Sequence, residues 1–132
     1  MIKQLYKNPV FNVEMEGHTS NWYKQETGIR QGCPLSPLLY AICAEILLER
    51  IRMELPSAVV RAYADDTAVL VQNLWTDIPI LAHIFSDFGT MANLRLNLSK
   101  TVVIPLFPQP DLASVKTTLT RSVPDWSSAQ FS

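Results

Sequence analysis

The chain has 132 residues and a formal net charge of −1, from 11 Lys and Arg against 12 Asp and Glu. This length fits one domain and is too short for two comfortable ones. Apolar residues make up 48% and charged residues 17%, which excludes disorder along the whole chain. Because clustered cations in excess are lacking, we expect only weak binding of nucleic acid by this chain alone.

Cysteine usage and hydropathy indicate the compartment. Cys33 and Cys43 form no CxxC pair, which argues against a disulfide framework and a zinc site. Residues 1–5 show no apolar stretch followed by a cleavage site, so no secretory signal is expected. The most apolar segment, 38–48, contains Glu45 and is too short to cross a bilayer. We therefore expect an intracellular protein, in the cytoplasm or nucleus, without membrane association.

The N-terminal part predicts the end of a helix and then a hairpin. Residues 1–6 indicate the last helical turns, because Asn8 precedes a proline and such residues disfavour helical geometry. Apolar and polar side chains alternate over 11–16, the period of a half-buried strand. A turn at 17–19 and a returning strand over 21–26 complete the hairpin.

A structured loop over 28–37, rich in Gly and Pro, leads into the first long helix. Ser36 and Pro37 suit the N-cap and the first helical position. The apolar spacing continues to about Met53, and Pro56 ends the helix. Its apolar face is wide enough that we expect it to be mostly buried.

Two runs rich in β-branched residues, 58–63 and 67–72, predict a second hairpin with a tight acidic turn. Asp77 is expected to cap the next helix. The expected buried face of that helix consists of Leu81, Ile84, Phe85, Phe88 and Met91. Alternating leucines over 94–98 predict a strand, and 101–106 adds an extended run.

Hairpins and helices in this order predict an α+β fold, an antiparallel sheet backed by helices. We expect the domain to cover residues 1–107. Residues 108–132 are rich in Ser, Thr and Pro and predict a poorly ordered tail. Two alternatives stay open for it: one helical turn near 112–119, and docking of Trp126 and Phe131 onto the domain.

Asp65 and Asp66 at the tip of the second hairpin are the first candidate site. Two adjacent carboxylates repel each other, and a divalent cation relieves that repulsion. Mg²⁺ suits such a pair because it binds carboxylate oxygens, keeps several waters and takes further ligands from substrate phosphates. For an isolated pair, an acidic solvated turn is the commoner outcome.

Two further segments are candidates for nucleotide contacts. Arg30 and Gln31 supply planar donors, Gly32 allows close backbone approach, and the following helix N-terminus favours anions. Asn97 and Lys100 stand near the end of a predicted strand, where a lysine can stabilise or protonate departing pyrophosphate. The alternatives are a rigid loop and an edge-strand lysine that blocks aggregation.

Together these segments resemble the reverse transcriptases of non-LTR (LINE-type) retrotransposons. The resemblance is carried by Gly28–Tyr40, by Ala62–Val71 with its Tyr-Ala-Asp-Asp turn, and by Ala92–Leu106. It implies a polymerase palm domain in which Asp65 and Asp66 are catalytic, with Asp65 the metal ligand and Asp66 in support at the metal site. Arg30, Gln31 and Gly32 match the loop that contacts incoming nucleotide and template. Lys100 matches a candidate general acid, and Asn97 is its companion in the motif.

The resemblance also implies missing parts. The family takes a further catalytic carboxylate from an earlier strand, and we expect that strand, the fingers and the thumb to be absent here. The complete enzyme would use Mg²⁺ or Mn²⁺, an RNA template, a DNA primer and dNTPs for nucleotidyl transfer. We therefore expect a fragment of an RNA-directed DNA polymerase that is inactive alone. The alternative is a non-catalytic retroelement remnant that acts as a binding module or has no function.

Overall fold

The computed structural model describes residues 7, 9–24, 32–108 and 110–132. Internal contacts divide the chain into two units, Met1–Tyr40 and Ala41–Ser132. The first unit contains short strand pairs, and the second contains the main core. The helix predicted over residues 1–6 lies outside the described residues.

The N-terminal unit contains the predicted hairpin. Its two strand pairs are antiparallel: β1 (Val10–Phe11) with β4 (Tyr23–Lys24), and β2 (Glu14–Met15) with β3 (His18–Thr19). The turn lies at Glu16 and Gly17, which have φ angles of 52° and 80°. Glycine adopts this left-handed conformation without steric cost, which explains the reversal at this point. The hairpin prediction is confirmed, but His18 and Thr19, predicted as part of the turn, form strand β3, and Val13 and Met15 are exposed instead of half-buried.

Helix α2 (Ser36–Glu54) begins and ends close to the predicted residues. One face buries Leu48 and Ile51, whereas Ile42, Ile46 and Met53 on the other face remain exposed. The expectation of a mostly buried apolar face was therefore wrong for this helix. Its apolar residues occupy two faces, and the rest of this unit covers only one of them.

Strands β5 (Val59–Tyr63) and β6 (Asp66–Leu70) form the predicted second hairpin. Val60 pairs with Val69 and is 7% exposed, so this face of the hairpin enters the core. Side chains alternate between the faces of a strand, and Val59 on the other face is 46% exposed. One face of the hairpin is thus packed and the other is open.

Helix α3 (Leu74–Ala92) starts one turn earlier than predicted, because Asn73 and not Asp77 is its N-cap. The Asn73 side chain accepts hydrogen bonds from the backbone N–H groups of Trp75 and Thr76, at 3.1 and 3.4 Å. These bonds satisfy donors that a helix N-terminus otherwise leaves without partners. The buried face matches the prediction at Leu81, Ile84 and Phe88, while Met91 is exposed.

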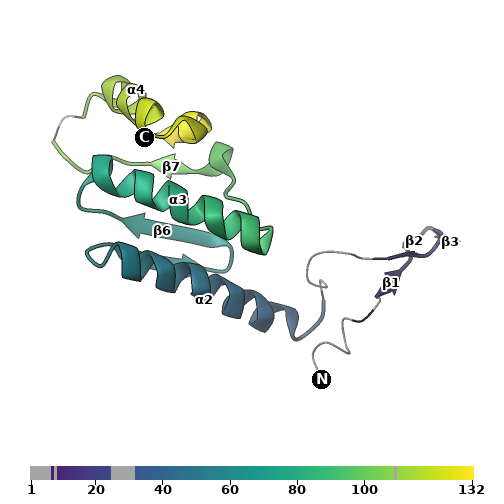
Figure 1. The fold of residues 1–132 in the computed structure, drawn as a ribbon. Helices are drawn as coiled ribbons and strands as arrows, with labels where there is room; N and C mark the ends of the chain where they lie inside the picture. The colour runs from purple at the N-terminus through teal and green to yellow at the C-terminus, as the bar shows by residue number, and fades with distance from the viewer. Residues whose placement is uncertain (1–6, 8, 25–31, 109) are drawn as a thin grey trace. The chain divides into compact units, whose positions relative to one another are not determined.

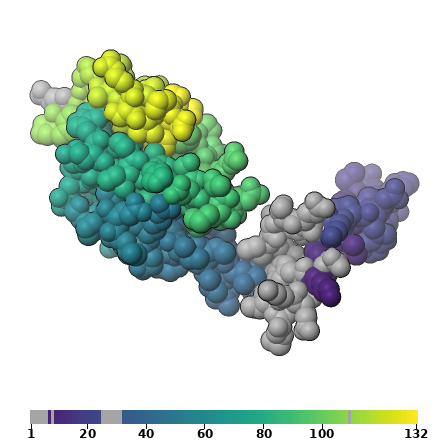
Figure 2. All heavy atoms as spheres, viewed as in Figure 1, coloured from purple at the N-terminus to yellow at the C-terminus, as the bar shows by residue number. Residues whose placement is uncertain are grey.

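The C-terminal residues are ordered, contrary to the expectation of a poorly ordered tail. They form α4 (Leu112–Ser122), the 3₁₀ helix η2 (Pro124–Ser128) and β8 (Gln130–Phe131), which pairs in parallel with β7 (Val102–Val103). Val115 and Leu119, four residues apart, face the same side of α4 and are buried. Trp126 and Ala129 are also buried in the core. Figure 2 shows this segment, in yellow, packed directly against the teal residues of the main unit.

Helices α2 and α3 lie side by side over the β5–β6 hairpin, with the C-terminal segment beyond α3 (Figure 1). Helices combined with small antiparallel strand pairs fit the predicted α+β class. One continuous antiparallel sheet is not present among the described residues, because every sheet there has two strands and β7–β8 is parallel.

Arg50 ties α2 to α3. Its Nη2 lies 2.8 Å from Asp87 Oδ2 on α3, and its Nε lies 2.7 Å from Glu54 Oε1 on α2. The hydrogen bond from Arg50 lowers the pKa of the Asp87 carboxyl below its ordinary value. A carboxylate whose pKa is lower in the folded state stabilises the fold above its unfolded pKa of about 3.9, and this contribution disappears as the pH falls through the folded pKa.

We therefore expect Asp87→Asn to lower the urea midpoint at pH 7, with the difference from the parent chain shrinking below about pH 4. Urea titrations monitored by circular dichroism between pH 7 and pH 2.5 measure this difference. In an Arg50→Gln background the pH dependence of the difference should largely vanish. A difference that stays constant down to pH 2.5 would contradict the assignment.

Candidate active site

Asp65 and Asp66 lie where the sequence predicted them, at the tip of the β5–β6 hairpin. Tyr63 pairs with Asp66, which leaves Ala64 and Asp65 as the two turn residues. Ala64 has a φ of 51°, the left-handed conformation that reverses the chain in so short a turn. Both carboxylates are exposed. Within the described part of the chain, neither makes a side-chain hydrogen bond or an ion pair, so both can accept an external ligand.

The strand register places Asp66 on the open face of the hairpin. Tyr63 is its cross-strand partner, and Arg61, two residues earlier, shares that face. Tyr63 is 86% exposed and Arg61 is also exposed. Sequence reasoning assigned no role to Arg61 or Tyr63, although the period of two along a strand could have identified both. The open face therefore combines a carboxylate, a guanidinium and a phenol.

Gly32 has a φ of 81°, a conformation that residues with a side chain rarely adopt. A Cβ atom built at this position would meet no atom within 4 Å. Backbone geometry and not crowding therefore favours glycine here. Arg30 and Gln31 lie outside the described residues. Gly32 belongs to the N-terminal unit and the aspartates to the other.

Asn97 and Lys100 do not lie on a strand, and the strand predicted over 94–98 was wrong. The structure has a 3₁₀ turn, η1 (Leu98–Lys100), in which the Asn97 carbonyl accepts the Lys100 N–H at 3.0 Å. The Asn97 Oδ1 atom accepts the Ser99 hydroxyl at 2.8 Å, and the Asn97 carbonyl also accepts the Thr101 hydroxyl at 3.0 Å. Such local side-chain bonds compete with strand pairing. Lys100 is exposed at the end of this turn.

The chain direction brings the acidic turn and the Lys100 turn to one end of the second unit. β6 leads away from the acidic turn, and α3 runs back along it, so the C-terminal end of α3 returns to that end (Figure 1). The turn η1 is the next element along the chain; α3 ends at Ala92 and η1 begins at Leu98. Among the described residues, no hydrogen bond or ion pair joins Lys100 to either aspartate.

The donor set at the hairpin tip is incomplete for a protein-only metal site. In the described ranges, no group of three or more His, Cys, Asp and Glu side chains is placed to hold a metal ion. Two carboxylates still suit Mg²⁺, which keeps several waters and completes its shell with phosphate oxygens.

Among the described residues, no helix is long and apolar enough to cross a membrane.

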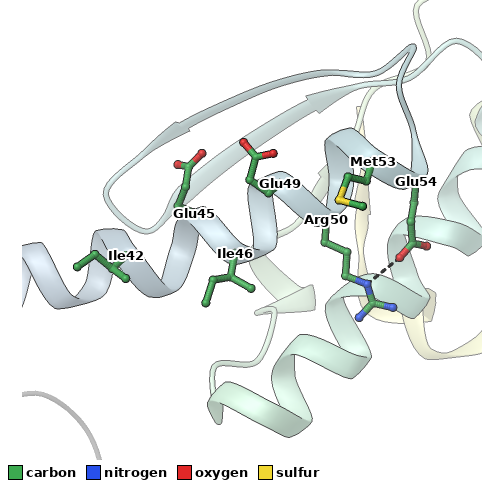
Figure 3. A pocket seen from close by; sticks show the side chains of 7 residues that line it. All are labelled: Ile42, Glu45, Ile46, Glu49, Arg50, Met53 and Glu54. Atoms are coloured by element: carbon green, nitrogen blue, oxygen red, sulfur yellow. Dashed lines mark hydrogen bonds and ion pairs between the residues drawn. The ribbon is translucent and has the colours of Figure 1, made fainter.

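A groove on α2 lies apart from the candidate site residues. Ile42, Ile46 and Met53 give it an apolar lining, and the carboxylates of Glu45 and Glu49 line it as well (Figure 3). The ion pair of Arg50 with Glu54 lies at one end of the groove. None of the residues that the sequence singled out for chemistry lines this groove.

Comparisons with known proteins bear on these features. A family model described as reverse transcriptase (RNA-dependent DNA polymerase) matches residues 1–118. The retrovirus-related Pol polyprotein from type-2 retrotransposable element R2DM of Drosophila melanogaster is 26% identical over 115 residues, which are 83% of this chain and 11% of that protein. The transposon TX1 uncharacterized 149 kDa protein of Xenopus laevis is 32% identical over 83 residues, which are 56% of this chain and 6% of that protein. No solved structure is significantly similar to the chain.

Proposed function

Because this chain belongs to the reverse transcriptase (RNA-dependent DNA polymerase) family, in its non-LTR retrotransposon type, we propose that it contributes the acidic hairpin of a polymerase palm. The observation that carries the proposal is the pair Asp65 and Asp66, exposed on a tight β-turn inside the matched range. The chain spans a small fraction of its relatives, so RNA template, DNA primer and dNTPs are proposed as partners of the longer protein.

In this proposal Asp65 and Asp66 hold Mg²⁺, or Mn²⁺ in its place, at the hairpin tip. When bound, the ion supplies positive charge to the phosphate oxygens of the incoming nucleotide. The aspartate side chains fit this task because they are exposed, adjacent and free of protein partners within the described residues. Arg61, on the same strand face as Asp66, adds a cation for phosphate, and its Nη1 donates to the Val60 carbonyl at 3.0 Å.

The remaining candidates take supporting roles in the proposed reaction. Lys100 donates a proton from its Nζ atom to the departing pyrophosphate, and Asn97 shapes the turn that carries it through its bond to the Ser99 hydroxyl. Arg30, Gln31 and Gly32 contact the incoming nucleotide and the template. These roles follow from the resemblance of the motifs and from the exposure of Lys100.

We also propose that the chain alone is inactive, since two carboxylates cannot clamp both the attacking and the leaving oxygens in a two-metal reaction. Primer extension on an RNA template should give no product with this chain, while the longer polymerase should give product. Robust synthesis by the chain alone would overturn this part of the proposal.

Metal binding tests the site without requiring activity. Titration of the chain with Mn²⁺, followed by NMR, should broaden the backbone signals of the hairpin tip first, because relaxation by the ion is strongest nearby. Asp65→Asn combined with Asp66→Asn should abolish this selective broadening, whereas Asp125→Asn, which changes an exposed carboxylate elsewhere, should leave it intact. Equal broadening in all three chains would favour the non-catalytic alternative.

A further inference from the structure

The turn that carries Lys100 is held by residues from the C-terminal segment. Gln130 Nε2 donates a hydrogen bond to the Ser99 carbonyl at 2.8 Å. The Gln130 backbone N–H donates to the Thr101 carbonyl, also at 2.8 Å. These two carbonyls stand immediately before and after Lys100 in the chain. Gln130 therefore forms hydrogen bonds to the backbone on both sides of Lys100.

Apart from Gln130, the turn is held by the short-range bonds of Asn97 with the Ser99 and Thr101 hydroxyls and by partly buried Leu98, which packs against the core. η1 is a single 3₁₀ turn, closed by the Lys100 and Thr101 N–H groups on the carbonyls of Asn97 and Leu98 at 3.0 and 3.1 Å. Hydrogen bonds in 3₁₀ turns have poorer geometry than those in α-helices. Both Ser99 and Lys100 are exposed, so water can replace these bonds when the turn opens. Hydrogen bonds from another segment therefore add to the order of the backbone at Ser99 and Lys100.

Gln130 can act as an anchor because its own backbone is fixed. Ala129, the residue before it, is 2% exposed and belongs to the core cluster with Trp126. The parallel β7–β8 pair continues the attachment, since the Ser132 N–H donates to the Val103 carbonyl at 3.2 Å. The hydrogen bonds from Gln130 to the Lys100 turn therefore start from a residue whose neighbours are packed in the core.

We propose that Gln130 is a positioning residue for Lys100 in the polymerase reaction. The inference rests on the proposed function, because it takes Lys100 as the group that meets the triphosphate. Gln130 lies beyond the range matched by the family model, which ends at residue 118. Its role is therefore argued from the hydrogen bonds of this structure alone.

Amide hydrogen exchange of the full chain tests whether the Gln130 side chain holds the Lys100 turn. Gln130→Ala and the isosteric Gln130→Glu both remove the side-chain donor to Ser99, and each should speed exchange of the Lys100 and Thr101 N–H groups by about five- to tenfold, the effect of losing one ordinary hydrogen bond. Ser128→Ala, on an exposed neighbour, is the matched control and should leave both rates unchanged. Unchanged exchange in the Gln130 variants overturns the inference.

A second measurement separates positioning from plain structural support. The Lys100 side-chain NMR signals should shift on addition of millimolar Mg²⁺ and dATP, and the shift should be smaller in Gln130→Ala than in Ser128→Ala. Faster exchange with an undiminished nucleotide response would show that the Gln130 hydrogen bond only supports the structure, and it would overturn the positioning role. If Lys100 of the parent chain does not respond to nucleotide, that result contradicts the proposed function instead. The exchange rates still test the hydrogen bond from Gln130 to the turn.

Discussion

Asp65→Asn is expected to lower the primer-extension rate of a longer polymerase that carries this chain by on the order of 10³-fold. The substitution replaces a charged oxygen ligand by a neutral amide at the exposed turn and removes several kcal/mol of charge stabilisation in the transition state. The measurement is single-nucleotide incorporation on an RNA template with saturating Mg²⁺ and dNTP. Asp66→Asn should also lower the rate.

Asp125→Asn is the matched control for this experiment. Asp125 is exposed on η2, away from the acidic turn in the sequence, and its change should leave the rate within about twofold, as is usual for surface substitutions. Asp65→Asn with the parent rate would contradict the assignment of the acidic turn as the catalytic one. Because the chain alone is proposed to be inactive, the comparison has meaning only in the longer protein.

Trp126→Ala is expected to lower the free energy of unfolding by about 3–5 kcal/mol, since truncating a buried aromatic residue removes apolar contacts and leaves a cavity. Trp126 is 7% exposed and belongs to the same core cluster as Ile51 and Ile84 of the two long helices. Domains of this size are stable by only about 5–15 kcal/mol, so the loss is a large part of the total. Urea denaturation followed by far-UV circular dichroism measures it.

Trp75→Ala supplies the control, because Trp75 stands at the start of α3 and is 43% exposed. Its replacement should change stability by roughly 0.5 kcal/mol or less. Similar small effects for both tryptophans would show that the C-terminal segment does not stabilise the core and that the expected disordered tail describes these residues better.

Sequence patterns predicted the elements whose structure is determined locally. The hairpin of residues 59–70 follows from two β-branched runs around a short acidic turn, and the start of α2 follows from Ser36 and Pro37. The start of α3 was misplaced because two polar residues, Asn73 and Asp77, could each cap it. Only the structure shows that Asn73 accepts the two backbone N–H groups.

Two further errors concern the segments that follow α3. Alternating leucines over 94–98 resembled a strand, but no described strand pairs with them, and the local bonds of Asn97 form a turn instead. The C-terminal residues looked disordered from their Ser, Thr and Pro content. Four apolar positions there, Leu119, Val123, Trp126 and Ala129, are nevertheless buried by packing on the core cluster.

Part of the candidate site could be predicted from short motifs, since an acidic pair on a tight hairpin is a local pattern. The contribution of Gln130 could not, because its partner Ser99 lies 31 residues away and no periodicity links them. The open-face positions Arg61 and Tyr63 depend on strand register, which becomes certain only when the pairing partners are known.

The parallel pairing of β8 with β7 has a practical consequence for recombinant work on this unit. A piece ended in the proline-rich stretch near residue 107 would lose β8 and would leave the backbone of Val102 and Val103 without its partner. Unpaired strand edges beside exposed apolar side chains promote association between molecules. Expression boundaries for this unit should therefore include Ser132, whose N–H donates to the Val103 carbonyl at the end of the strand pair.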